Sequence, residues 1–291
     1  MLPQLVCLTK ALNNLNIPFS QLDYDGNLIR VELPDQHYLF QKSYTPFNSE
    51  SVGKICLDKE HTYHILKNVI KMPKTLGFLD FSVAGNYPEY VRFNSLDKMV
   101  ESIEKQLIYP MIIKRNSGAL SKNVFLCNTR QELFLALETI FDKKSNSYDY
   151  VALAQTFVHT HEEYRAVFFN KKLVLAYERY TDQKNFKAGY WNLPGGCSRH
   201  IIDPSLLQEL QTFIEPIFRH IPANMVGVDI IRDMTGKLFL IELNSGARFN
   251  HFIQFNGEYP VIQMYENIFQ QLLANKQYND VNVTRNYEQT V

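Results

Sequence analysis

Apolar residues recur at two different periods along this chain, and the period indicates the type of each element. A spacing of three and four residues, together with capping residues and prolines at the start, predicts amphipathic helices. Thr129 and Glu132 have the spacing of a capping box, in which both side chains accept hydrogen bonds from backbone N–H groups of the first turn. The predicted helices are 5–15, 58–70, 96–107, 129–142, 204–220 and 260–275. The last fifteen or so residues are expected to fray.

Short apolar runs bounded by turn residues predict β-strands between these helices. The predicted strands are 28–33, 111–114, 124–127, 151–158, 164–170, 172–179, 226–231 and 238–243. Several of them are consecutive and joined by short turns, so they predict antiparallel hairpins. Antiparallel hairpins with packed helices are typical of an α+β protein rather than of a doubly wound sheet.

The last predicted hairpin carries the most specific chemistry. Its two apolar runs flank Thr235 and Gly236, and glycine supplies the positive φ that tight turns need. With these two residues as the turn, Asp229 lies directly opposite Glu242, and Asn244 shares the face of Glu242. Unpaired carboxylates are costly on a buried sheet face, so a cation is expected beside them. An all-oxygen set of donors suits Mg²⁺.

Bulk properties narrow the classes of function. The chain has 291 residues, of which 45% are hydrophobic, and this is enough for one or two cores. Its 30 Lys and Arg balance its 30 Asp and Glu, which disfavours non-specific binding to nucleic acid or to an anionic membrane. It shows neither a membrane-spanning run nor a signal-peptide pattern, and its cysteines are scattered. We therefore expect a cytoplasmic protein with reduced thiols.

Two further segments carry candidate sites. Lys114 ends an apolar strand and precedes the basic, small-residue loop 115–123. Such a loop offers backbone N–H groups to a phosphate, but an ordinary hairpin loop with a solvent-exposed lysine is the alternative. Glu162, Glu163 and Arg165 start a later strand, where the alternative to a site is a cross-strand ion pair worth under about 1 kcal/mol.

Histidine and nucleophile patterns are weaker. His61 and His64 are three residues apart, and His159 and His161 are two apart, but no second pair completes a zinc site. The chain has no Gly-x-Ser-x-Gly, and no cysteine has an evident histidine partner. Covalent catalysis therefore has no convincing candidate.

The order of these features resembles the ATP-grasp superfamily over about residues 55–275. The series is Lys59 at a helix start, Lys114 with its loop, a Glu-x-Arg hairpin, a Gly-Gly loop, and Asp followed by Glu-x-Asn on the next strand. The match is to amino-acid and peptide ligases, namely D-alanyl-D-alanine ligases, ribosomal-protein glutamate ligases and the ATP-grasp part of cyanophycin synthetase. It implies two α+β lobes that hold ATP between antiparallel sheets. The implied parts are a short N-terminal subdomain at 1–54, a central lobe at 55–150 and a C-terminal lobe at 151–291.

The resemblance also implies an ATP site. Lys59 and Lys114 resemble phosphate-contacting lysines, and the loop after Lys114 resembles the mobile loop that closes over the terminal phosphates. Glu163 resembles the ribose-binding carboxylate, with Glu162 as the alternative register. The chain has Gln155 where the family usually has Glu, which leaves an adenine contact there altered. The implied ATP-binding residues are Lys59, Lys114, Ser117, Gly118, Ser121, Gln155, Thr156, Phe157, Val158 and Glu163.

The remaining implied residues bind metal and the reacting groups. The implied ligands of two Mg²⁺ ions are Asp229, Glu242 and Asn244. Arg165 and Arg179 resemble cations near the transferred phosphate. Many family members read Asn-x-x-Pro-Gly after the last ligand, whereas this chain reads Ser-Gly-Ala-Arg248. Arg248 is then a candidate for binding a substrate carboxylate or an acyl phosphate, because its planar fork matches such oxygens.

The function implied is an ATP- and Mg²⁺-dependent ligase that joins a carboxylate to an amine, or to a carrier-protein thiol, through an acyl phosphate. That chemistry needs neutralisation of charge more than acid–base residues. Two alternatives stay open: a phosphotransferase that stops at a phosphorylated product, and an ATP-binding regulatory or assembly module without turnover. The expected partners are small-molecule substrates rather than nucleic acid or membrane. Dimers are common in the superfamily, so a homodimer is one state that the resemblance allows.

Overall fold

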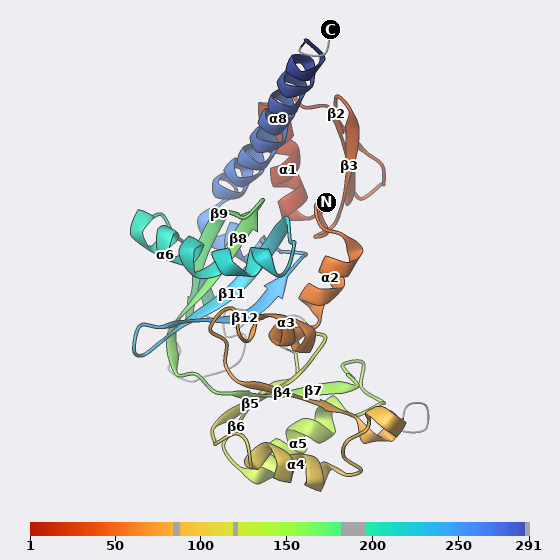
Figure 1. Cartoon of the computed structure of the whole chain (residues 1–291), viewed down its shortest axis with the longest axis vertical. Helices are drawn as coiled ribbons and strands as arrows, with labels where there is room; N and C mark the ends of the chain where they lie inside the picture. The colour runs from red at the N-terminus through yellow and green to blue at the C-terminus, as the bar shows by residue number, and fades with distance from the viewer. Residues whose placement is uncertain (84–87, 119–121, 182–195, 289–291) are drawn as a thin grey trace.

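Three antiparallel sheets organise the chain. The computed structural model describes residues 1–83, 88–118, 122–181 and 196–288, with all side chains in these ranges except those of 161, 181 and 275–288. The sheets contain three, four and five strands. The four-stranded sheet lies at one end of the molecule and the three-stranded sheet at the other, with the five-stranded sheet between them (Figure 1).

The N-terminal part shares its core with the C-terminal part. It consists of α1 (Pro3–Asn14) and a sheet of β1 (Phe19–Gln21), β2 (Leu28–Leu33) and β3 (Gln36–Gln41). The predicted helix at 5–15 and strand at 28–33 are confirmed. Leu8 and Phe40 are buried together with Phe169 and Phe269 of the C-terminal part, and the ring centroids of Phe40 and Phe269 are 6.2 Å apart. Residues 1–54 therefore do not have a separate hydrophobic core.

The central sheet has its own core. Its strand order is β4-β7-β5-β6, and α4 and α5 cover one face (Figure 1). Thr129 and Glu132 form the predicted capping box at the start of α5. The last strand of this part, β7, pairs with β4 and β5, although the predicted boundary after residue 150 assigned it to the C-terminal lobe. The bounds are β4 (Thr75–Leu79), α4 (Leu96–Glu104), β5 (Met111–Arg115), β6 (Val124–Cys127), α5 (Arg130–Ile140) and β7 (Val151–Thr156).

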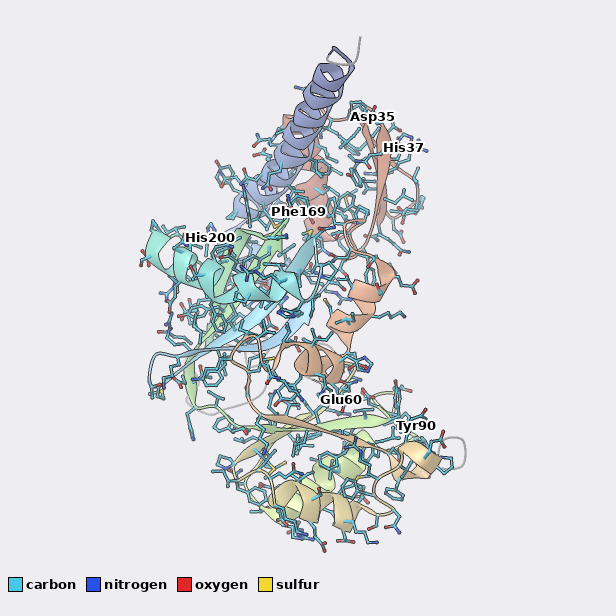
Figure 2. All side chains as sticks on the ribbon, in the orientation of Figure 1. Asp35, His37, Glu60, Tyr90, Phe169 and His200 are labelled. Carbon is cyan, nitrogen blue, oxygen red and sulfur yellow. The ribbon has the colours of Figure 1, made fainter. Side chains whose placement is uncertain are left out.

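Two short helices connect the N-terminal part to the central sheet. They are α2 (Glu50–Leu57), which the sequence did not reveal, and α3 (Lys59–Leu66), which falls within the predicted helix 58–70. Glu60 of α3 faces the central sheet (Figure 2), where a Cβ at Gly77 would lie 1.8 Å from the Glu60 Oε1. Gly77 thus allows α3 to approach β4 closely, and this glycine also interrupts the strand pattern that would have predicted β4.

The five-stranded sheet has the order β10-β9-β8-β11-β12. Alternate residues of β8, such as Ala166 and Phe168, are buried against α6, whereas Val167 and Phe169 are buried against the N-terminal part. The predicted hairpins are confirmed, while β10 was not predicted. The bounds are β8 (Thr160–Phe169), β9 (Lys172–Thr181), β10 (Gly196–His200), α6 (Pro204–Ile214), β11 (Met225–Asp233) and β12 (Leu238–Asn244).

The chain ends with α7 (Asn250–Asn256) and α8 (Tyr259–Glu288), so the last helix runs beyond the predicted end near 275. Cys7, Cys56 and Cys127 are buried free thiols. No described helix is both long and apolar enough to cross a membrane. Three 3₁₀ segments complete the described elements: η1 (Phe81–Val83), η2 (Pro88–Tyr90) and η4 (Glu215–Arg219).

Candidate active site

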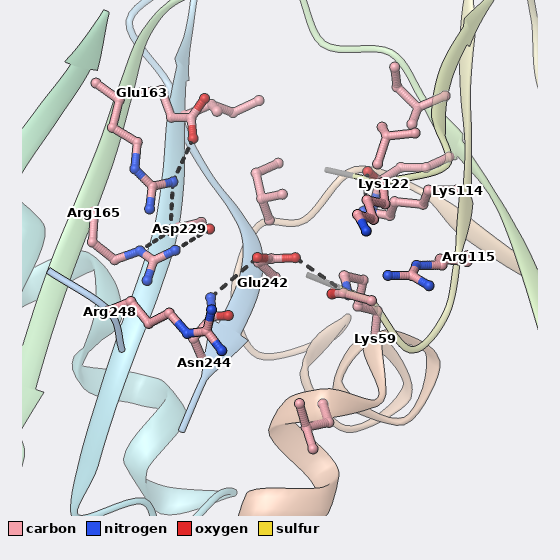
Figure 3. A pocket seen from close by; sticks show the side chains of 18 of the residues that line it. Lys59, Lys114, Arg115, Lys122, Glu163, Arg165, Asp229, Glu242, Asn244 and Arg248 are labelled. Carbon is pink, nitrogen blue, oxygen red and sulfur yellow. Dashed lines mark hydrogen bonds and ion pairs between the residues drawn. The ribbon is translucent and has the colours of Figure 1, made fainter. Parts of the chain in front are cut away.

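A pocket of about 470 Å³ lies between the central sheet and the five-stranded sheet. Strand alternation explains its charged wall, because the face of β8 that buries Val167 continues into the pocket as Arg165 and Glu163. Figure 3 shows these residues on one side and Lys114 of the central sheet on the other. The pocket is thus lined by both lobes.

The structure gathers most of the predicted site residues in this pocket. Ser117 does not line it, and its backbone N–H donates to Asp149 Oδ2 at 2.6 Å. Ser121 and residues 192–195 of the Gly-Gly loop lie outside the described residues. Glu162, the alternative ribose ligand, also lies outside the pocket lining, and it accepts a 2.7 Å hydrogen bond from Arg232 Nε. The predicted residues that line the pocket are Lys59, Lys114, Gly118, Gln155, Thr156, Phe157, Val158, Glu163, Arg165, Arg179, Asp229, Glu242, Asn244 and Arg248.

Lys114 is held by a buried chain of hydrogen bonds. Its Nζ donates to Gln155 Oε1 at 3.0 Å, and Gln155 Nε2 donates to Thr75 Oγ1 at 2.8 Å. The Thr75 hydroxyl donates its one hydrogen to the carbonyl of Pro73 at 3.0 Å. Its oxygen can therefore only accept from Gln155, which fixes the Gln155 amide nitrogen toward Thr75 and the amide oxygen toward Lys114. Burial, followed by the charge of Lys59, lowers the pKa of Lys114 to about 8.

Lys59 links the start of the loop 115–123 to the hairpin of β11 and β12. It is the first residue of α3, and Asp58 caps this helix by accepting a 2.8 Å hydrogen bond from the backbone of His61. The Lys59 Nζ donates to the carbonyls of Asn116 at 3.2 Å and Gly118 at 2.8 Å, and it lies 3.6 Å from Glu242 Oε2. The start of the loop is therefore fixed close to the predicted metal ligands.

Asp229 and Glu242 lie directly opposite each other in β11 and β12, as predicted. A β-bulge follows immediately, since Ile230 pairs with Leu240 and leaves Ile241 as the extra residue. Ile241 and Glu242 consequently both line the pocket, although they are adjacent in sequence. An apolar side chain and a carboxylate are thus offered to the same side of the strand.

Two arginines hold the carboxylates of the other wall. Arg165 binds Asp229 through Nε and through Nη2, the latter at 2.8 Å. Arg179 Nη1 lies 3.3 Å from Asp229 Oδ1 and 3.0 Å from Glu163 Oε1. Burial alone would raise the pKa of Asp229, but the two guanidinium groups outweigh it and hold the pKa at about 2. For Glu163 burial prevails over Arg179 and raises the pKa to about 7.

The donors on the hairpin fit Mg²⁺. Asn244 Nδ2 lies 3.3 Å from Glu242 Oε1, and Asp229 is directly opposite, so two carboxylates and one amide converge. These are hard oxygen donors, and Asp229 is ionised at neutral pH, as a metal ligand must be. Among the described residues, no group of three or more His, Cys, Asp and Glu could hold a metal ion. The Asn244 amide is therefore needed to complete the oxygen set of the hairpin.

Arg248 differs from the other arginines of the pocket. It is exposed and, within the part of the chain that the structure describes, it forms no ion pair. Figure 3 shows it beside Asn244, on the hairpin side of the pocket. Its charge is therefore available to a ligand, whereas Arg165 and Arg179 are engaged with carboxylates.

Several pocket residues were missed in the sequence. Arg115 and Lys122 line the pocket and belong to the basic loop 115–123, so composition gave a signal without assigning them. Ser43 and Tyr44 carry no such signal, because they reach the pocket only through tertiary packing. A Cβ at Gly246 would lie 3.4 Å from the Ser43 carbonyl oxygen, so the turn after β3 lies against the segment that follows Asn244.

Comparison with known proteins places this geometry in a family. Residues 86–268 match the model of the RimK-like ATP-grasp domain. No curated protein matches the chain. Among solved structures, the VanG D-Ala:D-Ser ligase from Enterococcus faecalis superimposes with a TM-score of 0.52 at 17% identity, over 74% of this chain and 62% of that one.

Two further structures agree in fold. The D-alanine–D-alanine ligase from Bacillus anthracis, complexed with ATP, gives a TM-score of 0.52 at 15% identity, over 80% of this chain and 71% of that one. A bifunctional glutathione synthetase from Pasteurella multocida gives a TM-score of 0.55 at 14% identity, over 90% of this chain and 44% of that one. The chain thus spans less than two thirds of VanG and of the glutathione synthetase. ATP-grasp ligases use ATP and Mg²⁺. The α+β fold, the pocket between two lobes and the match over 86–268 together show that the chain belongs to the RimK-like ATP-grasp family.

Proposed function

We propose that the protein is an ADP-forming ligase that activates a carboxylate as an acyl phosphate and joins it to an amine or a thiol. One observation carries the proposal. Lys59, Lys114, Asp229 and Glu242 line one pocket at the junction of two lobes. Cations for phosphate oxygens and carboxylates for a metal therefore line one space that suits a nucleotide, and Lys59 lies 3.6 Å from Glu242 where the two groups meet.

The proposed reaction has two steps. A substrate carboxylate oxygen attacks the γ-phosphorus of ATP, the bond between that phosphorus and the β–γ bridging oxygen breaks, and ADP leaves. The amine then attacks the acyl carbon, inorganic phosphate leaves, and the amine proton passes to solvent or to the departing phosphate. Both steps gain from fixed positive charge and need no protein nucleophile, which agrees with the residues in the pocket.

The chain's own residues divide this work. Lys59 and Lys114 bind phosphate oxygens, the segment from Thr156 to Val158 borders the base, and Glu163 binds the ribose. Asp229, Glu242 and Asn244 would hold Mg²⁺, which when bound neutralises phosphate charge. The residues that serve the reacting carboxylate and acyl phosphate are Arg165, Arg179 and Arg248. Of these, Arg248 forms no ion pair with a described residue, which favours it for the incoming carboxylate.

Turnover can be measured without knowing the substrate. The protein is incubated with ATP, Mg²⁺ and panels of amino acids and short peptides as acids and amines, with carrier-protein thiols as a further acceptor. We expect ADP and inorganic phosphate in equal amounts, together with a condensed product. A phosphorylated product without free phosphate would instead indicate a phosphotransferase. ATP binding without ADP formation on any panel would support a module without turnover.

Glu242→Gln tests the metal wall. The substitution keeps the size of the side chain but removes a charge that faces Lys59 and the proposed metal, so we expect activity to fall at least about a hundredfold, equivalent to about 2.7 kcal/mol. Glu209→Gln is the matched control, because Glu209 lies on α6, pairs with Arg232 of β11 and does not line the pocket. Circular dichroism checks the fold of both. Full activity of Glu242→Gln would remove Glu242 from the proposed site.

A further inference from the structure

Arg115 occupies a position that strand alternation does not predict. It follows Lys114 at the end of β5, and neighbouring strand residues normally point to opposite faces. Both nevertheless line the pocket. Figure 3 shows the Arg115 guanidinium on the same side of the pocket as Lys114, with its end directed toward Lys59.

Gly118 makes this position possible. A Cβ at residue 118 would lie 2.2 Å from Arg115 Nε and 2.9 Å from Arg115 Cγ, which no real contact allows. The stem of Arg115 therefore crosses the bare backbone of Gly118 on its way to the pocket. The backbone conformation of Gly118 is not left-handed, so the glycine is needed here for space rather than for a positive φ.

No described carboxylate lies within ion-pair distance of Arg115. Its Nε is buried without a hydrogen-bond partner, and Arg115 forms no ion pair with any residue that the structure describes. The nearby Asp149 uses its oxygens to accept hydrogen bonds from the backbone of Ser117 and Val151. Three lysines (Lys59, Lys114 and Lys122) line the same pocket. Among the described residues, Lys59 is the one of these four cations that lies within ion-pair distance of a carboxylate, with Glu242 Oε2 at 3.6 Å. A polyanion bound between the other three would be stabilised by their charge.

We infer that Arg115 is a further phosphate-binding residue, which grips the terminal phosphates of ATP, and that Gly118 is a glycine because it leaves the path of this side chain open. The inference rests on the proposed function and extends it. The guanidinium fork pairs with phosphate oxygens through two parallel hydrogen bonds, which an ammonium group cannot do.

The test measures nucleotide binding directly, by calorimetry with a non-hydrolysable ATP analogue and with AMP, both in Mg²⁺. Arg115→Met should weaken binding of the ATP analogue by about ten- to a hundredfold, the usual range for a charge-assisted hydrogen bond. AMP binding should be unchanged, because AMP lacks the terminal phosphates. The affinity of Arg115→Lys for the ATP analogue should lie between those of Arg115→Met and the wild type. Arg30→Met is the matched control, since Arg30 also has a buried Nε without a partner but lies on β2 and does not line the pocket.

Gly118→Ala is a second, independent test. Its methyl group displaces Arg115 without removing the charge, so this substitution should also weaken binding of the ATP analogue. In the Arg115→Met background it should add little, because both changes act on one interaction. Equal loss in both backgrounds would contradict the proposed path.

The possible failures are distinguishable. If the wild type binds no ATP analogue, the proposed function fails. If the wild type binds it and Arg115→Met binds it equally well, only the role of Arg115 fails. Unchanged analogue binding with a raised KM for the acid substrate would also overturn the inference, because it would assign Arg115 to the acid.

Discussion

Lys114 shows how a single buried residue can make nucleotide binding depend on pH. Burial and Lys59 lower its pKa to about 8. Below pH 8 it is charged and ready to bind a phosphate. Above pH 8 the free protein loses this proton, so binding has to restore it. We predict that the affinity for an ATP analogue falls from pH 8 to pH 9.5, by up to about tenfold per pH unit, as measured by calorimetry at fixed Mg²⁺.

Lys114→Arg separates this residue from other titrating groups. A guanidinium group stays charged throughout this range, so the pH dependence above 8 should flatten even if the larger side chain weakens binding overall. A wild-type affinity that stays constant to pH 9.5 would contradict the prediction. An equally steep fall in the variant would assign the titration to another group.

The orientation of the Gln155 side chain could not be predicted from the sequence. The hinge strand and Lys114 were predicted, but the side chain of Gln155 is oriented by Thr75. Thr75 belongs to β4, which was not predicted because its pattern is interrupted by Gly77. An orientation set by a strand distant in sequence has no local signature.

At the scale of elements, the β11–β12 hairpin was predicted for a reason that is only partly correct. A turn at Thr235 and Gly236 would pair every residue of β11 in one register. Ile230 instead pairs with Leu240, one residue off that register, and the bulge at Ile241 restores it at Asp229 and Glu242. The one-residue shift in register near the turn is thus offset by the extra residue of the bulge. The metal wall was therefore predictable, whereas the pocket-facing position of Ile241 was not.

The close packing around Gly227 of β11 supports a prediction about this glycine. A Cβ at this position would lie 3.1 Å from Arg165 Nη1 and 3.2 Å from Ala247 Cβ. Gly227→Ala should push Arg165 away from Asp229, lower activity at least about tenfold and destabilise the fold by about 1 kcal/mol. Turnover and urea denaturation measure the two effects. Activity equal to wild type would show that Arg165 tolerates the shift.

Gly53→Ala is the matched control for this substitution. Gly53 lies within α2, and its added Cβ would come no closer than 3.8 Å to another side chain, the Ser245 hydroxyl. Alanine is a better helix former than glycine, so we expect unchanged activity and a gain in stability of about 0.5–1 kcal/mol.

At the scale of the whole molecule, the predicted three-part division needs a different physical basis. Residues 1–54 were expected to form a subdomain, but Leu8 and Phe40 are buried with Phe169 and Phe269 in one core. Local periodicity predicted α1 and β2 because it depends on neighbours in sequence. It could not show that α1 packs against α8, since that contact joins segments far apart in the sequence.

This arrangement predicts how the protein unfolds. The central sheet has a separate core that includes Leu133, whereas Leu8 lies in the core shared by the N-terminal and C-terminal parts. Leu8→Ala and Leu133→Ala should each cost about 2–5 kcal/mol, but in different transitions, which calorimetry can resolve. An ATP analogue with Mg²⁺ contacts residues from both sides of the pocket, such as Lys114 and Asp229, and should raise both transition temperatures. Because each variant leaves the pocket lining intact, its analogue affinity at low temperature should match wild type. If either variant lowered both transitions equally without nucleotide, the two lobes would have to unfold as one unit.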